Sequence, residues 1–436
     1  MPLPRISTGR LAALVATTCA ALLACFAGSA SGAIGDISTF PVPTPNSQPT
    51  GIATAPDGSI WFTEGDLLSG DKIGRITNSG RITEFPVPTP NSQPTYIAPG
   101  PDGNMWFVEY ATNKIGKITP SGSVTEYPIP TTDSQPISIA AGPDGNMWFT
   151  EGGGNKIGRI TMSGKITEFP IPSPSSFTQI IARGPDGNMW FTESGANKVA
   201  KISMTGKITE FPMPTPDSAP VGIAQGPDGN MWVAVAVGNK IAKVSTSGKI
   251  TEYEVPTADS GPFGITWGPD GNMWFTERLG NKVASITTAG KITEYPLPSP
   301  SADLLLPTAG NDGGVWFTES DTNSIGRIET GARFTITSTA PSGNALLTRG
   351  RVPGFGRLSQ KALIAGSRRT GCAASKSVAR AGSYVIRCRL NKVAIAKRRK
   401  GSLRLVVSTT FRPTGATPRT LRRTVVFRAV KRSFSG

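Results

Sequence analysis

The chain has 436 residues, enough for two or three domains, and a globular composition that excludes a disordered or fibrous protein. Its 45 Lys and Arg against 29 Asp and Glu give a formal net charge of +16, and it contains no histidine. The absence of histidine excludes the side chain that serves most often as a general base.

Residues 1–33 are predicted to be a secretory signal. Arg5 and Arg10 precede the apolar run 11–27, and small residues follow up to Ala33, where cleavage is expected. One alternative is a single membrane anchor, for which the run is short. Another is a lipoprotein signal, with Cys25 carrying the lipid. We therefore expect a secreted or cell-surface protein.

Residues 36–330 repeat one unit, whose most regular stretch is Gly-Pro-Asp-Gly-Asn-Met-Trp-Phe-Thr-Glu at 142–151. Each unit has four short apolar runs separated by glycine turns, as at 139–141, 147–150, 156–160 and 165–169. One tryptophan marks each copy: Trp61, Trp106, Trp148, Trp190, Trp232, Trp274 and Trp316. Seven copies of a four-stranded antiparallel meander predict an all-β protein with a seven-bladed β-propeller over residues 34–330.

The closure of the propeller can also be predicted. Residues 37–46 match the outer-strand segment 82–91 but have no preceding blade. We expect them to complete the seventh blade beside 324–328, so that no long sheet edge is exposed. The alternative for that place is 333–337. A closed propeller needs no partner to cover its edges, so a monomer is expected.

Residues 331–436 are predicted to form a small basic β-sandwich-like module. Alternating runs at 383–390, 403–411 and 421–430 indicate strands, and Cys372 and Cys388 are expected to form a disulfide. This region has 24 basic and no acidic residues, whereas 34–330 has 19 basic and 29 acidic ones. The charge favours an anionic partner, for which an anionic cell-envelope polymer is preferred and no specific nucleic acid is expected. Lipid head groups and released nucleic acid bound by charge are alternatives, and a merely solubilising surface is another.

The repeat resembles the virginiamycin B lyase family of seven-bladed propellers in four segments: Gly-Ile-Ala, the ten-residue stretch at 142–151, Asn-Lys-Ile-Gly-Arg-Ile-Thr, and Ile-Thr-Glu-Phe-Pro-Ile-Pro. The resemblance implies a lyase that opens a cyclic depsipeptide of the streptogramin B type by elimination, with Mg²⁺, acidic residues and a histidine base. Because the chain has no histidine, no catalytic residue is assigned. Elimination would need another base, such as Tyr96 or a glutamate.

A glutamate ends the second strand of six repeats, on the face where propellers usually bind ligands. Carboxylates at one level could bind a hard cation such as Mg²⁺ or Ca²⁺, and the candidates are Glu64, Glu109, Glu151, Glu193, Glu277 and Glu319. The alternative is an ion pair within each hairpin, as between Glu151 and Lys156. A second set of glutamates on the outermost strands, such as Glu168, is expected to be a solvated edge.

Departures from the repeat indicate a ligand pocket at the start of the inner strands. Tyr96, Gln179, Phe263 and Arg278 would provide a mixed aromatic and polar lining next to the glutamates. Drift among the repeats is the alternative explanation.

Three functions are compatible with these patterns. The preferred one is a secreted binding module that takes a small molecule or peptide on the ligand face and is held near the cell surface by its basic module. The second is a divalent-metal-dependent carbon–oxygen lyase, and the third is a structural or interaction propeller.

Overall fold

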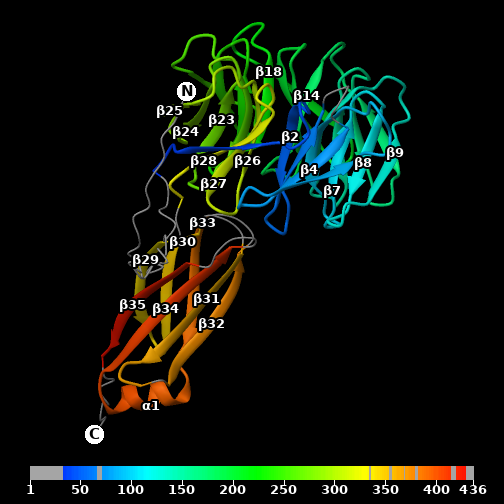
Figure 1. The fold of residues 1–436 in the computed structure, drawn as a ribbon. Coiled ribbons are helices and arrows are strands. Elements are labelled where there is room, and N and C mark those ends of the chain that lie inside the picture. Colours follow the sequence, from blue (N-terminus) through cyan, green and yellow to red (C-terminus); the bar gives the residue numbers. More distant parts are fainter. Residues whose placement is uncertain are drawn as a thin grey trace, which may run out of the picture. The chain divides into compact units, whose positions relative to one another are not determined.

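The computed structural model describes residues 33–65, 71–332, 335–352, 356–367, 369–378, 382–413 and 419–428, so the predicted signal, apart from Ala33, lies outside the described residues. Within these ranges the chain is almost entirely β-structure, as predicted (Figure 1). None of the described helical residues belongs to a helix long and apolar enough to cross a membrane.

Seven four-stranded antiparallel sheets form the first part of the chain, which confirms the predicted propeller (Figure 1). Within the first six sheets the strands follow chain order, and the inner strand of each blade packs against the inner strand of the next. The first blade contains β2 Pro49–Thr54, β3 Ile60–Glu64, β4 Lys72–Ile76 and β5 Ile82–Pro86, and the second contains β6 Pro94–Pro99, β7 Met105–Glu109, β8 Lys114–Ile118 and β9 Val124–Pro128. The third contains β10 Pro136–Ala141, β11 Met147–Glu151, β12 Lys156–Ile160 and β13 Ile166–Pro170, and the fourth contains β14 Thr178–Arg183, β15 Met189–Glu193, β16 Lys198–Ile202 and β17 Ile208–Pro212. The fifth contains β18 Pro220–Gln225, β19 Met231–Val235, β20 Lys240–Val244 and β21 Ile250–Glu254, and the sixth contains β22 Pro262–Trp267, β23 Met273–Glu277, β24 Lys282–Ile286 and β25 Ile292–Pro296.

The repeated tryptophans hold the blades together. Trp148 is completely buried, stacks on Phe169 with a centroid distance of 5.5 Å, and donates from Nε1 to Asp144 of the preceding turn at 3.1 Å. It shares a buried cluster with Phe191 of the next blade. The pairing of an indole with both an apolar neighbour and a fixed acceptor explains why Trp recurs at this position.

The seventh blade combines both ends of the propeller. It contains β26 Leu304–Ala309, β27 Gly314–Glu319 and β28 Ser324–Glu329, and its outer strand is β1 Ile37–Pro41. Strand β1 runs antiparallel to β28, from Ile37 opposite Ile328 to Pro41 opposite Ser324. The predicted closure is therefore confirmed, and residues 335–337 lie in the C-terminal module instead.

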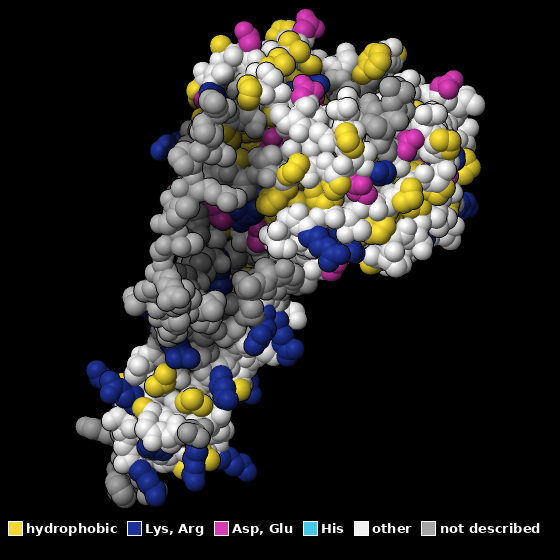
Figure 2. Space-filling model, viewed as in Figure 1, with side chains coloured by type: hydrophobic (Ala, Val, Ile, Leu, Met, Phe, Trp, Pro, Cys, Tyr) yellow, Lys and Arg dark blue, Asp and Glu magenta, His cyan; other side chains and the backbone are white. Residues whose placement is uncertain are grey.

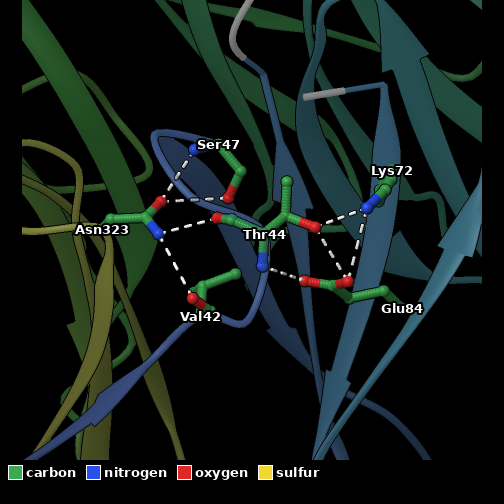
Figure 3. Close-up of polar contacts among 6 residues, drawn as sticks. All are labelled: Val42, Thr44, Ser47, Lys72, Glu84 and Asn323. Carbon is green, nitrogen blue, oxygen red and sulfur yellow. Dashed lines mark hydrogen bonds and ion pairs between the residues drawn. The ribbon is translucent and has the colours of Figure 1, made fainter. Parts of the chain in front are cut away.

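Side-chain hydrogen bonds complete this junction (Figure 3). The Asn323 amide donates to the carbonyls of Val42 and Thr44, at 3.3 and 2.8 Å, and its oxygen accepts from the main chain and hydroxyl of Ser47. Asn323 has a positive φ of 52°, which asparagine tolerates better than most residues. Asn155 makes the equivalent contacts inside the chain, so closure repeats the standard link between blades.

The C-terminal module consists of two sheets, in strand order β29-β30-β33 and β32-β31-β34-β35. Buried residues from both sheets form one cluster, including Leu346, Leu405 and Phe427. The bounds are β29 Thr335–Ser342, β30 Ala345–Val352, β31 Gly356–Ile364, β32 Thr370–Val378, β33 Gly382–Arg389, β34 Leu403–Pro413 and β35 Arg419–Phe427. The three predicted runs correspond to β33, β34 and β35, although residues 429 and 430 lie outside the described ranges.

Two features fix the module locally. The predicted disulfide between Cys372 and Cys388 is present and joins β32 of one sheet to β33 of the other. A helix that the sequence analysis missed, α1 Lys392–Lys400, follows Asn391, whose side chain accepts from the Ala394 N–H at 3.0 Å. Only Ala394 is buried in this helix, so it lacks the apolar period by which helices are recognised.

Candidate functional site

A cavity of about 170 Å³ lies where the inner strands of the seven blades begin. Every inner strand contributes its second residue to the lining: Thr50, Thr95, Ile137, Gln179, Val221, Phe263 and Leu305. Tyr96, Ile180 and Leu306 complete it. The cavity is mostly apolar with a few polar groups, as ligand sites commonly are.

A repeated bulge aims these residues into the cavity. In the third blade the β10–β11 register shifts between Pro136 and Ile139, and the freed N–H of Ser138 donates to the Thr150 hydroxyl at 3.1 Å. The same hydroxyl donates to the carbonyl of Gln179 in the next blade at 2.8 Å. The threonine of the repeat thus joins the peptide group that follows the lining residue Ile137 to the lining residue Gln179 of the next blade.

The second blade departs from this pattern because Val108 replaces the threonine. Valine has no hydroxyl, and Tyr96 instead pairs in register with Val108. Burial raises the pKa of Tyr96 to about 12, although a hydrogen bond with Ser138 acts to lower it. The phenol therefore stays protonated at neutral pH and is a poor general base there.

Three of the four predicted pocket residues line the cavity, and the fourth adjoins it. Tyr96, Gln179 and Phe263 are in the lining. The Arg278 guanidinium lies over the Phe263 ring, 5.4 Å from its centroid, and binds the Asp303 carboxylate at 2.5 and 3.2 Å. The departures from the repeat are therefore brought together at one place.

The six candidate glutamates do not join them. Each carboxylate is completely buried within its own blade, and none lines the cavity. A Cβ atom added to Gly154 would lie 3.0 Å from Glu151 Oε2, so the β11–β12 loop covers this carboxyl closely. The glutamates are nevertheless close to the lining, since Glu151 is the register partner of Pro136, which directly precedes the lining residue Ile137.

Burial changes the acidity of these glutamates. It raises the pKa of Glu64, Glu109, Glu193 and Glu277 to about 7 and that of Glu151 to about 8, and it also raises the pKa of Glu319. Within the described part of the chain, both carboxyl oxygens of Glu151 and of Glu193 lack a hydrogen-bond partner. A buried carboxyl without a partner favours its neutral form.

The ion pairs that the sequence suggested within each hairpin form with the glutamates of the outer strands and not with those of the second strands. Lys156 binds Glu168 on the neighbouring outer strand at 3.0 Å and not Glu151. Glu168 also accepts from the Thr131 main chain at 3.1 Å, and its side chain is only 16% exposed. The outer glutamates are therefore not a solvated edge: each binds the loop that leads from the preceding blade into its own blade (Figure 3 shows Glu84 with Thr44 and Lys72).

The glutamates also do not form a shared set of metal ligands. Across the described ranges there is no group of three or more acidic, cysteine or histidine side chains placed to hold a metal ion. Six buried carboxyls in separate blades do not fit one magnesium ion, which prefers an octahedral set of oxygen ligands. The metal assignment remains a prediction for experiment.

Three exposed apolar side chains extend the site and were missed in the sequence. Phe177 precedes β14, Val237 follows β19 and Leu279 follows β23, and they are 58%, 73% and 75% exposed. All three occur in loops on the side of the propeller where the inner strands begin. The signal available in the sequence was that other repeats carry mostly polar or small residues there, as at Gln135 and Gly153.

The family model for virginiamycin B lyases matches residues 29–238 and 226–346. A streptogramin B lyase structure is 40% identical, with a TM-score of 0.65 over 67% of this chain and 97% of its own. The chain belongs to the virginiamycin B lyase family. A search of the curated proteins found no match.

Other solved structures agree with this membership. Virginiamycin B lyase from Staphylococcus aureus is 39% identical, with a TM-score of 0.64 over 67% of this chain and 99% of that chain. A catalytically inactive histidine-to-alanine variant of that enzyme with quinupristin is 38% identical, with a TM-score of 0.65 over the same shares. The extracellular domain of a putative two-component system from B. thetaiotaomicron, 13% identical, has a TM-score of 0.56 over 90% of this chain and 57% of its own, which shows fold similarity alone.

Proposed function

We propose that this member of the virginiamycin B lyase family is a secreted or cell-surface binding module. Its propeller takes a small molecule or peptide with apolar groups, and its cationic C-terminal module associates with an anionic cell-envelope polymer. The observation that carries the proposal is the cavity at the start of the inner strands, whose lining, among the described residues, has Tyr96 as its one titratable side chain.

The size and surroundings of the cavity suggest how a ligand binds. At about 170 Å³ it is smaller than the roughly 300–1,000 Å³ of sites that enclose a whole drug-sized ligand. It would therefore hold one apolar group, while Phe177, Val237 and Leu279 contact the rest of the molecule. Arg278 and Gln179 offer hydrogen-bond donors at the rim. A compact molecule with several apolar groups, such as a cyclic peptide, matches this arrangement.

A lyase remains the second candidate, because the chain is 40% identical to a streptogramin B lyase over 97% of that structure. It would need a base other than histidine. Tyr96 would have to ionise against a pKa of about 12, and the glutamates with a pKa near 7 are completely buried and do not line the cavity. These facts favour binding without turnover.

Quinupristin and the full chain provide a direct test. Calorimetric titration measures binding, and chromatographic retention measures ring opening, since elimination yields a linear isomer of unchanged mass. Binding without an isomer supports the binding module, whereas accumulation of the linear isomer supports the lyase. Absence of both would contradict this ligand class.

Variants then locate the site. Phe263→Ala and Leu279→Ala are expected to weaken binding at least tenfold each, since burying an apolar side chain contributes about 1.5–3 kcal/mol. Val426→Ala removes a comparably exposed apolar side chain from the C-terminal module and should have no effect. If turnover does occur, Tyr96→Phe should abolish it only if the phenol is the base.

A further inference from the structure

The outward face of the sheet β32-β31-β34-β35 carries an ordered array of hydroxyl and cationic side chains. One row across the four strands consists of Ser375, Ser359, Thr410 and Thr420, which are direct partners in the strand register. The Thr410 and Thr420 hydroxyls are hydrogen-bonded at 2.7 Å. The row borders an open hollow of about 770 Å³.

Cationic residues flank this row on both sides. On one side Arg357 is the register partner of Arg412, and its guanidinium donates to the Ser375 hydroxyl at 3.1 Å. On the other side Lys361 and Arg422 are both register partners of Ser408, so they are two strands apart. Adjacent strands are about 4.8 Å apart, which separates the Lys361 and Arg422 backbones by about 10 Å.

The face is free of the features that would make it a core or an ion-paired surface. Its alternating neighbours, such as Leu358, Ala362 and Leu405, are buried on the opposite side of the sheet. The region from residue 331 onward contains no acidic residue that could neutralise these cations. In Figure 2 the C-terminal module accordingly shows dark blue side chains and no magenta ones.

Two sets of six propeller glutamates are not free to complement this charge, although the formal charge of the propeller is negative. Glu151 and the five equivalent glutamates are completely buried, with a raised pKa. Glu168 and its equivalents on the other outer strands are 12–17% exposed and bound to lysines. Exposed carboxylates remain at Asp133, Asp217 and Asp259, so binding to a second copy of the chain is a competing outcome that the test below distinguishes.

The side chains of the face also indicate the chemistry of that molecule. Among the described residues, the outward positions of these strands include no aromatic side chain on which a nucleic-acid base could stack. Serine and threonine hydroxyls can both donate and accept, which suits a partner that carries many hydroxyls.

We propose that this face binds a linear, hydroxyl-rich polyanion. Arg357, Arg412, Lys361 and Arg422 neutralise its acid groups, and the row through Ser359 and Thr410 binds its hydroxyls. The inference rests on the proposed function, which assigns an anionic partner to this module, and it adds the surface and the chemistry of that partner.

The test compares two charge-matched variants of the full chain. The face variant combines Arg357→Gln, Lys361→Gln and Arg422→Gln. The helix variant combines Lys397→Gln, Arg399→Gln and Lys400→Gln, which removes the same charge from exposed positions of α1. Both are titrated with polygalacturonate, which carries carboxylates, and with poly(glycerol phosphate), at low and moderate salt. Thermal unfolding confirms that both variants are folded.

We expect the unmodified chain to bind at least one of the two polymers, and the one bound identifies the acid group. The face variant should lose at least tenfold in affinity and show a weaker salt dependence, and the helix variant should stay within threefold. Ser359→Ala with Thr410→Ala, which leaves the charge unchanged, should lose severalfold.

Equal losses in the two triple variants would overturn the proposal, because binding would then follow net charge alone. It would also be overturned by binding to neither polymer, by preferential binding to a DNA duplex or phosphatidylglycerol vesicles, or by self-association of the chain that the face variant abolishes. Quinupristin titration of the same samples separates these results from a failure at the propeller site, which the face variant should leave unchanged.

Discussion

The side-chain amide of Asn323 donates to the main-chain carbonyl of Thr44 at 2.8 Å, across 279 positions of sequence. In the third blade Asn155 makes the same bond to the carbonyl of Ser173 at 2.9 Å, across 18 positions. The same hydrogen bond therefore stabilises a loop of the continuous chain at Asn155 and, at Asn323, links two segments that no short stretch of chain connects.

Asn323→Gly is expected to destabilise the closure. Glycine tolerates the positive φ, so the change removes hydrogen bonds without adding strain, at a cost of about 1–3 kcal/mol. Amide hydrogen exchange should then accelerate across β1. Asn155→Gly is the matched control, and β1 exchange should stay slow in it. Equal exchange of β1 in both variants would show that Asn323 has no special role in closure.

The stability of the propeller should fall as pH rises from about 5 to 8. The ring glutamates have a pKa near 7 or 8 when folded, against 4.5 ordinarily, so the folded state binds more protons than the unfolded state in this range. Stability that is fully present below pH 4.5 is lost as pH rises through the folded pKa. Chemical denaturation at pH 5 and pH 8 measures the difference, and Glu151→Gln with Glu193→Gln should reduce it.

Glu168→Gln is the control for this pH dependence, because the pKa of Glu168 is lowered in the folded protein and not raised. Burial acts to raise the pKa of Glu168, but hydrogen bonds from Lys156 and Thr131 lower it overall. Its contribution is present above pH 4.5 and is lost as pH falls through the folded pKa. A pH profile that Glu168→Gln flattens as much as the double variant does would contradict the assignment to the buried set.

Magnesium and calcium are expected to leave the thermal midpoint of the propeller unchanged, because the six glutamates occupy separate blades and do not share a ligand site. An ion bound to the folded state alone would stabilise it by about 2.7 kcal/mol at a hundredfold excess over its Kd. Stabilisation in the unmodified chain that is absent from Glu151→Gln with Glu193→Gln would establish a metal site and strengthen the lyase candidate.

Removal of the disulfide should weaken the C-terminal module selectively. Cys372 and Cys388 are 16 positions apart and join the two sheets, so Cys372→Ser with Cys388→Ser is expected to cost about 2–4 kcal/mol. Differential scanning calorimetry should show a lower transition for the module and an unchanged one for the propeller. A shift of the propeller transition would mean that the two parts unfold together.

The fold was largely predictable because its signals are periodic. Trp148 and its equivalents mark each blade, and the match between 37–46 and 82–91 identifies the closing strand. The helix α1 was not predictable in this way, since it buries only Ala394 and is held by the cap at Asn391. Long-range packing and a single side-chain cap leave little trace in hydrophobic periodicity.

The candidate site was predictable only where the repeat breaks. Tyr96, Gln179 and Phe263 stood out because six other blades provide the comparison. The partner of Lys156 was predicted wrongly, because Glu151 lies directly opposite it in the register. Glu168 is opposite Gly158 and is only a diagonal neighbour, yet it is the carboxylate that Lys156 binds. The apolar loop residues, such as Leu279, can be recognised as part of the candidate site only once the fold places them on the side of the propeller where the inner strands begin.

The pairing of β1 with β28 means that the propeller can close only after almost all of its residues have been synthesised. Ile37 is among the earliest propeller residues to be made, and its partner Ile328 is among the last. At roughly 5–20 residues per second, about 290 residues take on the order of 15–60 s to synthesise. During that time β28, the strand with which β1 pairs, has not yet been made. Any factor that keeps the nascent chain soluble must therefore act longest on β1.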